Sequence, residues 1–104
     1  MNTADQARDE ALADVRDHAA REWVHYAELA LHAICFTNET FTSAMVWNVL
    51  RARHPFVKTS DPRAMGAVMK RASGNWCEPT DRTAPSDNRV SHGRRLTIWR
   101  SLVR

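Results

Sequence analysis

The feature that most constrains the fold is an N-terminal stretch that contains neither proline nor glycine. It covers residues 3 to about 35 and is rich in alanine, glutamate, aspartate and arginine. Such a composition predicts one long helix, with Thr3 as its N-cap. Its apolar residues follow one another at steps of three or four, the spacing of a single helical face. They are Leu12, Val15, Ala19, Trp23, Tyr26, Ala30 and Ile34.

A helix of this length is out of proportion to the rest of the chain. About 32 residues at 1.5 Å each span roughly 48 Å, whereas a compact body of the remaining ~65 residues is only about 28 Å across. We therefore expect the helix to overhang the body, to fray at its start or to pair with another copy, and we favour a frayed or partner-contacting start. From Trp23 onward more than one face is apolar, so this part is expected to be buried. The residues expected to contact a partner are Trp23, Tyr26 and Leu29.

Charge is divided unequally along the 104 residues, which are enough for one domain but not for two independent cores. Residues 1–40 hold eight acids and three bases, a net charge of −5, whereas residues 41–104 hold twelve bases and four acids, a net charge of +8. This division favours a polyanionic partner for the basic half. Two solvated faces that aid solubility would explain the charges equally well.

Several classes of protein are disfavoured by the composition. Three glycines are too few for a glycine-rich phosphate loop. No apolar run approaches the roughly 18 residues of a membrane span, and the acidic start is unlike a targeting peptide. Cys35 and Cys77 lie 42 residues apart without a CxxC motif, which fits neither a zinc site nor a disulfide framework. We expect a protein of the bacterial cytoplasm with free thiols and no cofactor.

Catalytic and metal-binding constellations are also lacking in the sequence. It contains no HExxH, GxSxG or serine–lysine motif. His18, His25 and His32 recur every seven residues, but two helical turns place neighbours about 10 Å apart, too far for one metal ion. We therefore expect neither an enzyme nor a small-molecule substrate.

The remaining chain divides into short elements bounded by turn residues. Phe41-Thr42 is expected to be extended and Ser43 to about Arg53 helical, with Thr42 or Ser43 as the cap. Asp61 and Pro62 give a strong helix start, and Gly74 a stop, for a third helix over residues 62–72 or 73. A hairpin is expected to follow, with strands at Asn75–Pro79 and Arg94–Ser101 and a polar loop at Thr80–Gly93.

The third helix has the most specific pattern. At 100° per residue, its core face carries Met65, Val68, Met69 and Ala72. The opposite face and its flanks carry three cations and two minimal side chains, and no acid: Arg63, Gly66, Ala67, Lys70 and Arg71. A helix that enters the major groove of DNA needs small residues for close approach, arginine for guanine and lysine for phosphate. The mid-helix glycine is explained either by such an approach or by tight packing against the second helix.

The hairpin supplies a second group of bases. Arg82 and Arg89 lie in the expected loop, and Arg94 and Arg95 begin the returning strand. A basic arm beside a recognition helix can follow the DNA backbone or enter a minor groove. A mobile polar loop without a ligand would also account for the loop bases, so the strand bases are the better candidates for phosphate contacts.

The order short strand, helix, helix, basic hairpin resembles the winged helix-turn-helix family. The residues that carry the resemblance are Phe41-Thr42, PRAMGAVMKRA at 62–72, WCEPT at 76–80, Ser91–Arg94 and Ile98–Ser101. The chain is similar to small winged-helix proteins of bacteriophages and prophages, notably of actinobacteria. The resemblance implies that the helix from Pro62 is the recognition helix and that Thr80–Gly93 is the wing.

The expected fold class is therefore mainly α with a small β-hairpin (α+β), a winged helix-turn-helix preceded by a long helix. Residues 1–38 would form the acidic helix, which packs on or extends from the domain, and residues 39–104 the winged helix. The expected function is non-enzymatic binding of double-stranded DNA, as a phage-type regulator or replication accessory. The alternative is a protein-interaction module that binds a host protein or a second copy through the long helix.

Overall fold

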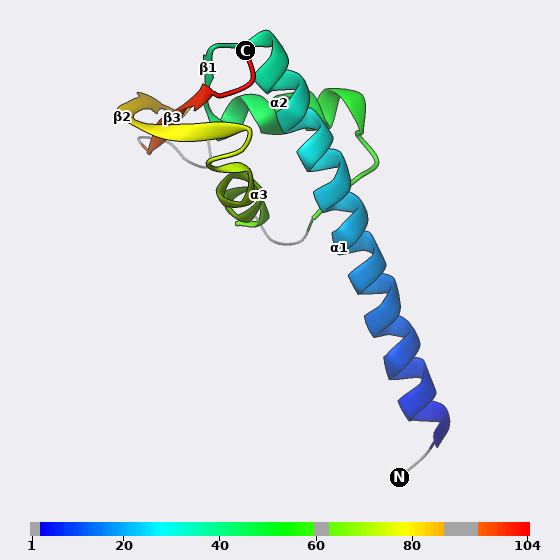
Figure 1. Ribbon diagram of the computed structural model, residues 1–104. Coiled ribbons are helices and arrows are strands. Elements are labelled where there is room, and N and C mark those ends of the chain that lie inside the picture. The colour runs from blue at the N-terminus through cyan, green and yellow to red at the C-terminus, as the bar shows by residue number, and fades with distance from the viewer. Residues whose placement is uncertain (1–2, 60–62, 87–93) are drawn as a thin grey trace.

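The computed structural model describes residues 3–59, 63–86 and 94–104, and within these ranges it describes side chains from Ala19 onward (Figure 1). In this part of the chain the protein is a mixed α+β structure with three helices and a three-stranded antiparallel sheet. The elements follow in the order α1 (Thr3–Thr37), β1 (Thr40–Phe41), α2 (Ser43–Arg53), α3 (Ala64–Ala72), β2 (Cys77–Pro85) and β3 (Arg95–Ser101).

Helix α1 is the long helix that the sequence predicts, and it begins at Thr3. Its 35 residues span about 52 Å at the usual rise, and the molecule measures 55 × 30 × 24 Å along its principal axes. The C-terminal half of α1 packs on the body, and the N-terminal half projects beyond it (Figure 1). The expected overhang is therefore present.

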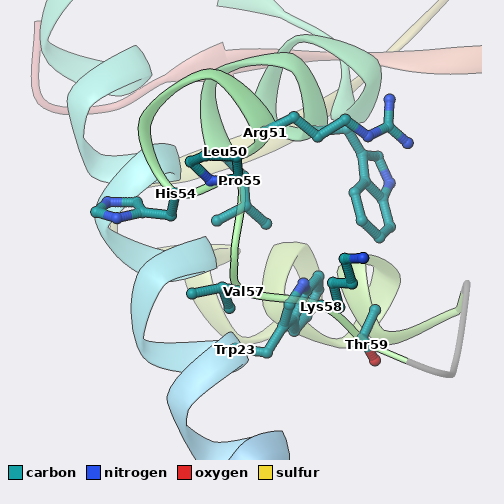
Figure 2. Close-up of a pocket in the computed structure, with 9 residues that line it drawn as sticks. Trp23, Leu50, Arg51, His54, Pro55, Val57, Lys58 and Thr59 are labelled. Atoms are coloured by element: carbon teal, nitrogen blue, oxygen red, sulfur yellow. The ribbon is translucent and has the colours of Figure 1, made fainter.

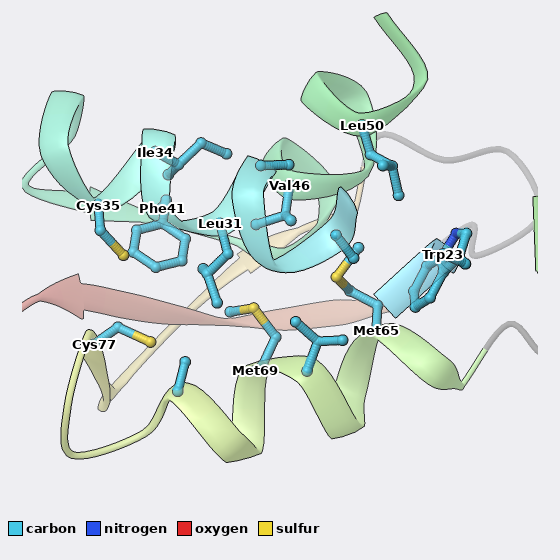
Figure 3. Packing of buried hydrophobic residues seen from close by; sticks show 14 residues of the cluster. Trp23, Leu31, Ile34, Cys35, Phe41, Val46, Leu50, Met65, Met69 and Cys77 are labelled. Carbon is cyan, nitrogen blue, oxygen red and sulfur yellow. The ribbon is translucent and has the colours of Figure 1, made fainter. Parts of the chain in front are cut away.

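The core lies between α1, α2, α3 and one face of the sheet (Figure 3). Its buried apolar residues come from every element except β3, which contributes the partly buried Trp99: Trp23, Ala27, Ala30, Leu31, Ile34, Cys35, Phe41, Val46, Leu50, Met65, Val68, Met69, Ala72 and Cys77. Burying a large aliphatic or aromatic side chain contributes about 1.5–3 kcal/mol, so the α1 residues are a substantial part of the stabilisation. The core thus crosses the boundary between residues 1–38 and 39–104.

The sheet has the strand order β1-β3-β2, so the last strand lies between the two earlier ones. Strand β1 pairs with β3 through Phe41 and Trp99, and β2 pairs with β3 from Cys77 opposite Ser101. The Ser101 hydroxyl donates a 2.6 Å hydrogen bond to the Cys35 carbonyl oxygen. This bond fixes the C-terminal strand to the end of α1.

The predicted hairpin loop is wrong in its first part. Residues 80–85 continue β2 instead of forming a loop, after a register irregularity between Pro79 and Thr83. The Thr80 hydroxyl donates a 2.7 Å hydrogen bond to the Ile98 carbonyl oxygen within this irregularity. The strand extends past the core, so its residues are polar and lack the apolar alternation by which strands are predicted. The rest of the predicted loop, residues 87–93, lies outside the described residues.

The helix predictions agree more closely with the structure. Helix α2 has the predicted bounds, with Thr42 at its N-cap, and Val46 and Leu50 are buried in the core as expected. Helix α3 is described from Ala64, with Arg63 in the N-cap position and Ser73 in the C-cap position. The predicted cap at Asp61 and Pro62 lies outside the described residues.

Candidate nucleic-acid interface

The exposed face of α3 carries the residues that the helical phasing assigned to it. Met65, Val68, Met69 and Ala72 are buried, and the predicted site residues on the other side are all exposed: Arg63, Gly66, Ala67, Lys70 and Arg71. The predicted division between core face and outer face is confirmed. The outer face combines cationic side chains with two positions of minimal size, so its backbone is unusually accessible to a large ligand.

Gly66 is not required for packing against any described residue. Apart from its chain neighbours and the backbone of its own helix, a Cβ atom built at this position meets no atom of the described residues within 4 Å, and the residue has no positive φ angle. The explanation by tight packing against α2 is therefore wrong. Glycine in a helix costs about 0.5–1 kcal/mol relative to alanine. No contact in the described part of the chain requires a glycine here and so offsets this cost.

Arg71 is partly engaged by the acidic helix. Its guanidinium lies 3.6 Å from a carboxylate oxygen of Glu28 on α1, with the two side chains 71% and 35% exposed. An exposed ion pair of this kind contributes between zero and about 1 kcal/mol. The pair shows that α1 brings negative charge to the flank of α3, which the sequence could not reveal because the partners are 43 residues apart.

The predicted hairpin bases that the structure describes lie in two different environments. Arg82 lies on β2 and Arg94 immediately before β3, and both are exposed, whereas Arg89 lies outside the described residues. Arg95 donates from Nε to the Thr83 hydroxyl at 2.7 Å and from Nη2 to the Thr83 carbonyl oxygen at 3.0 Å. Arg95 therefore stiffens the hairpin and presents its cation from a fixed position.

A further hairpin base, which the sequence did not single out, is Arg100. It is directly opposite Glu78 in the β2–β3 register and forms an ion pair with it. Opposite charges at directly opposed strand positions stabilise a sheet modestly. Its charge is thus balanced within the sheet, and Arg100 adds less to a positive surface than Arg82 or Arg94.

The three residues expected to contact a partner lie at different depths. Trp23 is only 1% exposed and belongs to the core, so its side chain is not available to a partner in this conformation. Tyr26 is half-buried, and its ring centroid lies 4.2 Å from that of His54. Leu29 is 45% exposed and points outward from α1 on the same helical face as Phe36, which is 60% exposed. The exposed apolar surface of α1 is therefore centred on Leu29 and Phe36.

Both thiols are buried, as the sequence predicts for Cys35. Burial raises the pKa of the Cys35 thiol, and it raises the pKa of Cys77 to about 12. A thiol reacts as its thiolate, so neither sulfur is a nucleophile at neutral pH. Among the described residues, no group of three His, Cys, Asp or Glu side chains lies close enough to hold a metal ion.

Comparisons with protein-family models, with curated proteins and with solved structures find no match to this chain. In the part of the chain that the structure describes, none of the helices combines the length and the apolar character needed to cross a membrane.

Proposed function

We propose that this chain is a non-enzymatic DNA-binding protein of the winged helix-turn-helix type, with α3 in the major groove and the β2–β3 hairpin as a basic wing. The observation that carries the proposal is the outer face of α3. Two minimal side chains, Gly66 and Ala67, lie there between the exposed cations Arg63 and Lys70. A recognition helix needs this combination of close approach and positive charge.

The chain order and the sheet order support the same proposal. The order α1, β1, α2, α3, β2, β3 with sheet order β1-β3-β2 puts a two-stranded hairpin directly after α3. The hairpin points away from the free half of α1, which carries most of the acids (Figure 1). DNA that contacted α3 and the hairpin would therefore avoid most of the negative charge of the long helix. The connection between α2 and α3 departs from a simple helix-turn-helix. It covers residues 54–63, whereas the turn of the simple motif has three or four residues.

Duplex binding measured by fluorescence anisotropy tests the proposal. With about four to six phosphate contacts, the logarithm of the association constant should fall against the logarithm of salt concentration with a slope of roughly −4 to −5. The double variant Arg63→Gln with Lys70→Gln should weaken binding by about ten-fold or more and make the slope shallower.

A matched control removes the same charge elsewhere. Arg53→Gln with Arg104→Gln deletes two exposed cations that lie outside α3 and the hairpin. This control should retain most of the affinity, because a long-range charge effect alone is screened beyond about 10 Å at 0.1 M salt. Absence of duplex binding at low salt, or equal losses in the two double variants, contradicts the proposed interface.

A second candidate function is a protein-interaction module that acts through α1. It is favoured by the overhang of the helix and by two large apolar side chains that are exposed on the described part of α1, Leu29 and Phe36. Light scattering on the full chain tests self-association, with Leu29→Glu and Phe36→Glu as disrupting variants. If the full chain forms a dimer that both variants dissolve, α1 serves a second copy; if it is monomeric, this form of the second candidate is refuted.

A further inference from the structure

A hollow with an apolar wall and a cationic edge lies apart from the α3 face and from the hairpin. It is formed by α1, α2 and residues 54–59, which follow α2, and its volume is about 370 Å³. Figure 2 shows its lining residues, which are Trp23, Trp47, Leu50, Arg51, His54, Pro55, Val57, Lys58 and Thr59. None of the charged residues in this lining belongs to the proposed DNA interface.

The walls of the hollow suit a flat apolar group. The half-buried ring of Trp47 lines the hollow and packs on the buried ring of Trp23, with centroids 5.4 Å apart and planes tilted by 48°. The pair forms an aromatic corner of which Trp47 is the accessible part. Leu50, Pro55 and Val57 supply aliphatic surface around it. Small-molecule sites are typically lined in this way, with few polar groups to fix orientation. Aromatic pairs also favour tilted or offset arrangements, which a planar ring can adopt against this corner.

The charged side chains among the described residues that line the hollow are Arg51 and Lys58, and both are cationic. The guanidinium carbon of Arg51 lies 5.1 Å from the centre of the Trp47 ring, a cation–π contact that holds the arginine beside the aromatic corner. Lys58 projects toward the side of the hollow where Arg51 lies (Figure 2). Among the described residues that line it there is no aspartate or glutamate. A guanidinium can bind a carboxylate through two parallel hydrogen bonds, so this edge selects an anion, and specifically a planar one.

The size of the hollow limits the ligand. Ligand pockets commonly enclose about 300–1,000 Å³, and the volume here, about 370 Å³, lies near the lower end. One or two fused rings with a single acidic group fit within this space.

We propose that this hollow is a binding site for a small planar aromatic carboxylate. The ring system lies against Trp47, behind which Trp23 is buried, and the carboxylate is held by Arg51 and Lys58. The site goes beyond the proposed DNA-binding function and does not depend on it, because none of these four residues contributes to the α3 face or the hairpin.

Calorimetry and NMR on the full chain, with naphthoate as the probe, test this site. Naphthoate should bind with a Kd between roughly 50 µM and 1 mM, as expected for a ligand of this size. The indole N–H signal of Trp47 should shift on binding, and those of Trp76 and Trp99, which do not line the hollow, should stay in place. The uncharged amide of the same acid should bind about ten-fold more weakly or worse, because it carries no negative charge to pair with the two cations.

Matched variants identify the cationic edge. Arg51→Gln and Lys58→Gln should each weaken naphthoate binding by about ten-fold, and Arg53→Gln, on the same helix but outside the hollow, should leave it unchanged. The proposal is overturned by an absence of binding at about 5 mM naphthoate, by equal affinity for the acid and its amide, or by equal effects of the Arg51 and Arg53 variants. Chemical shifts confined to Trp76 or Trp99 would also overturn it.

Discussion

Replacing Gly66 by alanine should stabilise the protein and weaken its binding to DNA. The new methyl group enters open space, since a Cβ at this position meets no atom within 4 Å. Alanine also restricts the unfolded chain, which stabilises the native state by about 0.5–1 kcal/mol when the backbone is compatible. For a domain of this size the melting temperature should rise by about 3–8 °C. Thermal and urea unfolding followed by circular dichroism measure the change.

Gly74, which follows the C-terminal end of α3, provides the control. Gly74 has a φ angle of +90°, a conformation that alanine adopts at a cost of about 1–2 kcal/mol. Gly74→Ala should therefore destabilise the fold while Gly66→Ala stabilises it. If Gly66→Ala lowers the melting temperature, the view that Gly66 has no packing function is refuted.

The same substitution separates function from stability. In the proposed complex the Gly66 backbone approaches the edges of the bases, so an added methyl group should weaken duplex affinity by about ten-fold. A more stable protein that binds DNA less tightly cannot be explained by unfolding. If Gly66→Ala stabilises the fold and leaves duplex affinity unchanged, close approach at this residue is refuted.

Three further predictions concern charge, pH and thiol chemistry. Glu28→Gln should release Arg71 and raise duplex affinity at low salt by about two- to five-fold in the anisotropy assay, with a stability change below about 1 kcal/mol. Burial lowers the pKa of His32 below 6.5, and the nearby Glu28 carboxylate opposes this shift with a smaller effect. Just below pH 6.5 the unfolded state therefore binds more protons than the native state. The free energy of unfolding, measured in urea, should therefore be highest above pH 6.5 and fall as the solution is acidified, and His32→Gln should reduce this dependence. Burial raises the pKa of both Cys35 and Cys77, so a disulfide reagent should label neither thiol in the native protein at pH 7. Both thiols should be labelled in denaturant. Rapid labelling of the native protein would contradict their burial.

The helices could be predicted from the sequence because each one buries a continuous face. Met65, Val68 and Met69 recur with the helical period, and the structure buries all three. The same reasoning failed at residues 80–85, where β2 extends beyond the core and its pairing depends on backbone and threonine hydrogen bonds. A strand with neither face buried carries no hydrophobic period, so its composition is that of a loop.

The candidate site could be predicted only where it lies on one element. The α3 face follows from helical geometry alone, and the structure exposes it as predicted. The contact between Arg71 and Glu28 and the bonds from Arg95 to Thr83 depend on how separate elements pack. The aromatic corner of the hollow likewise joins Trp23 to Trp47 across two helices. The contact between Arg51 and Trp47, by contrast, joins residues one turn apart on the same helix, a spacing that is visible in the sequence.

The most direct measurement of the central claim is an NMR titration of the ¹⁵N-labelled full chain with a short DNA duplex. The largest shifts should fall on the backbone amides of Gly66, Ala67 and Lys70 and on those of Arg94 and Arg95. The amides of the projecting half of α1 should not respond, because its acids repel the phosphates. Shifts concentrated on α1, or no shifts at low salt, would contradict the assignment of α3 and the hairpin as the DNA-binding surface.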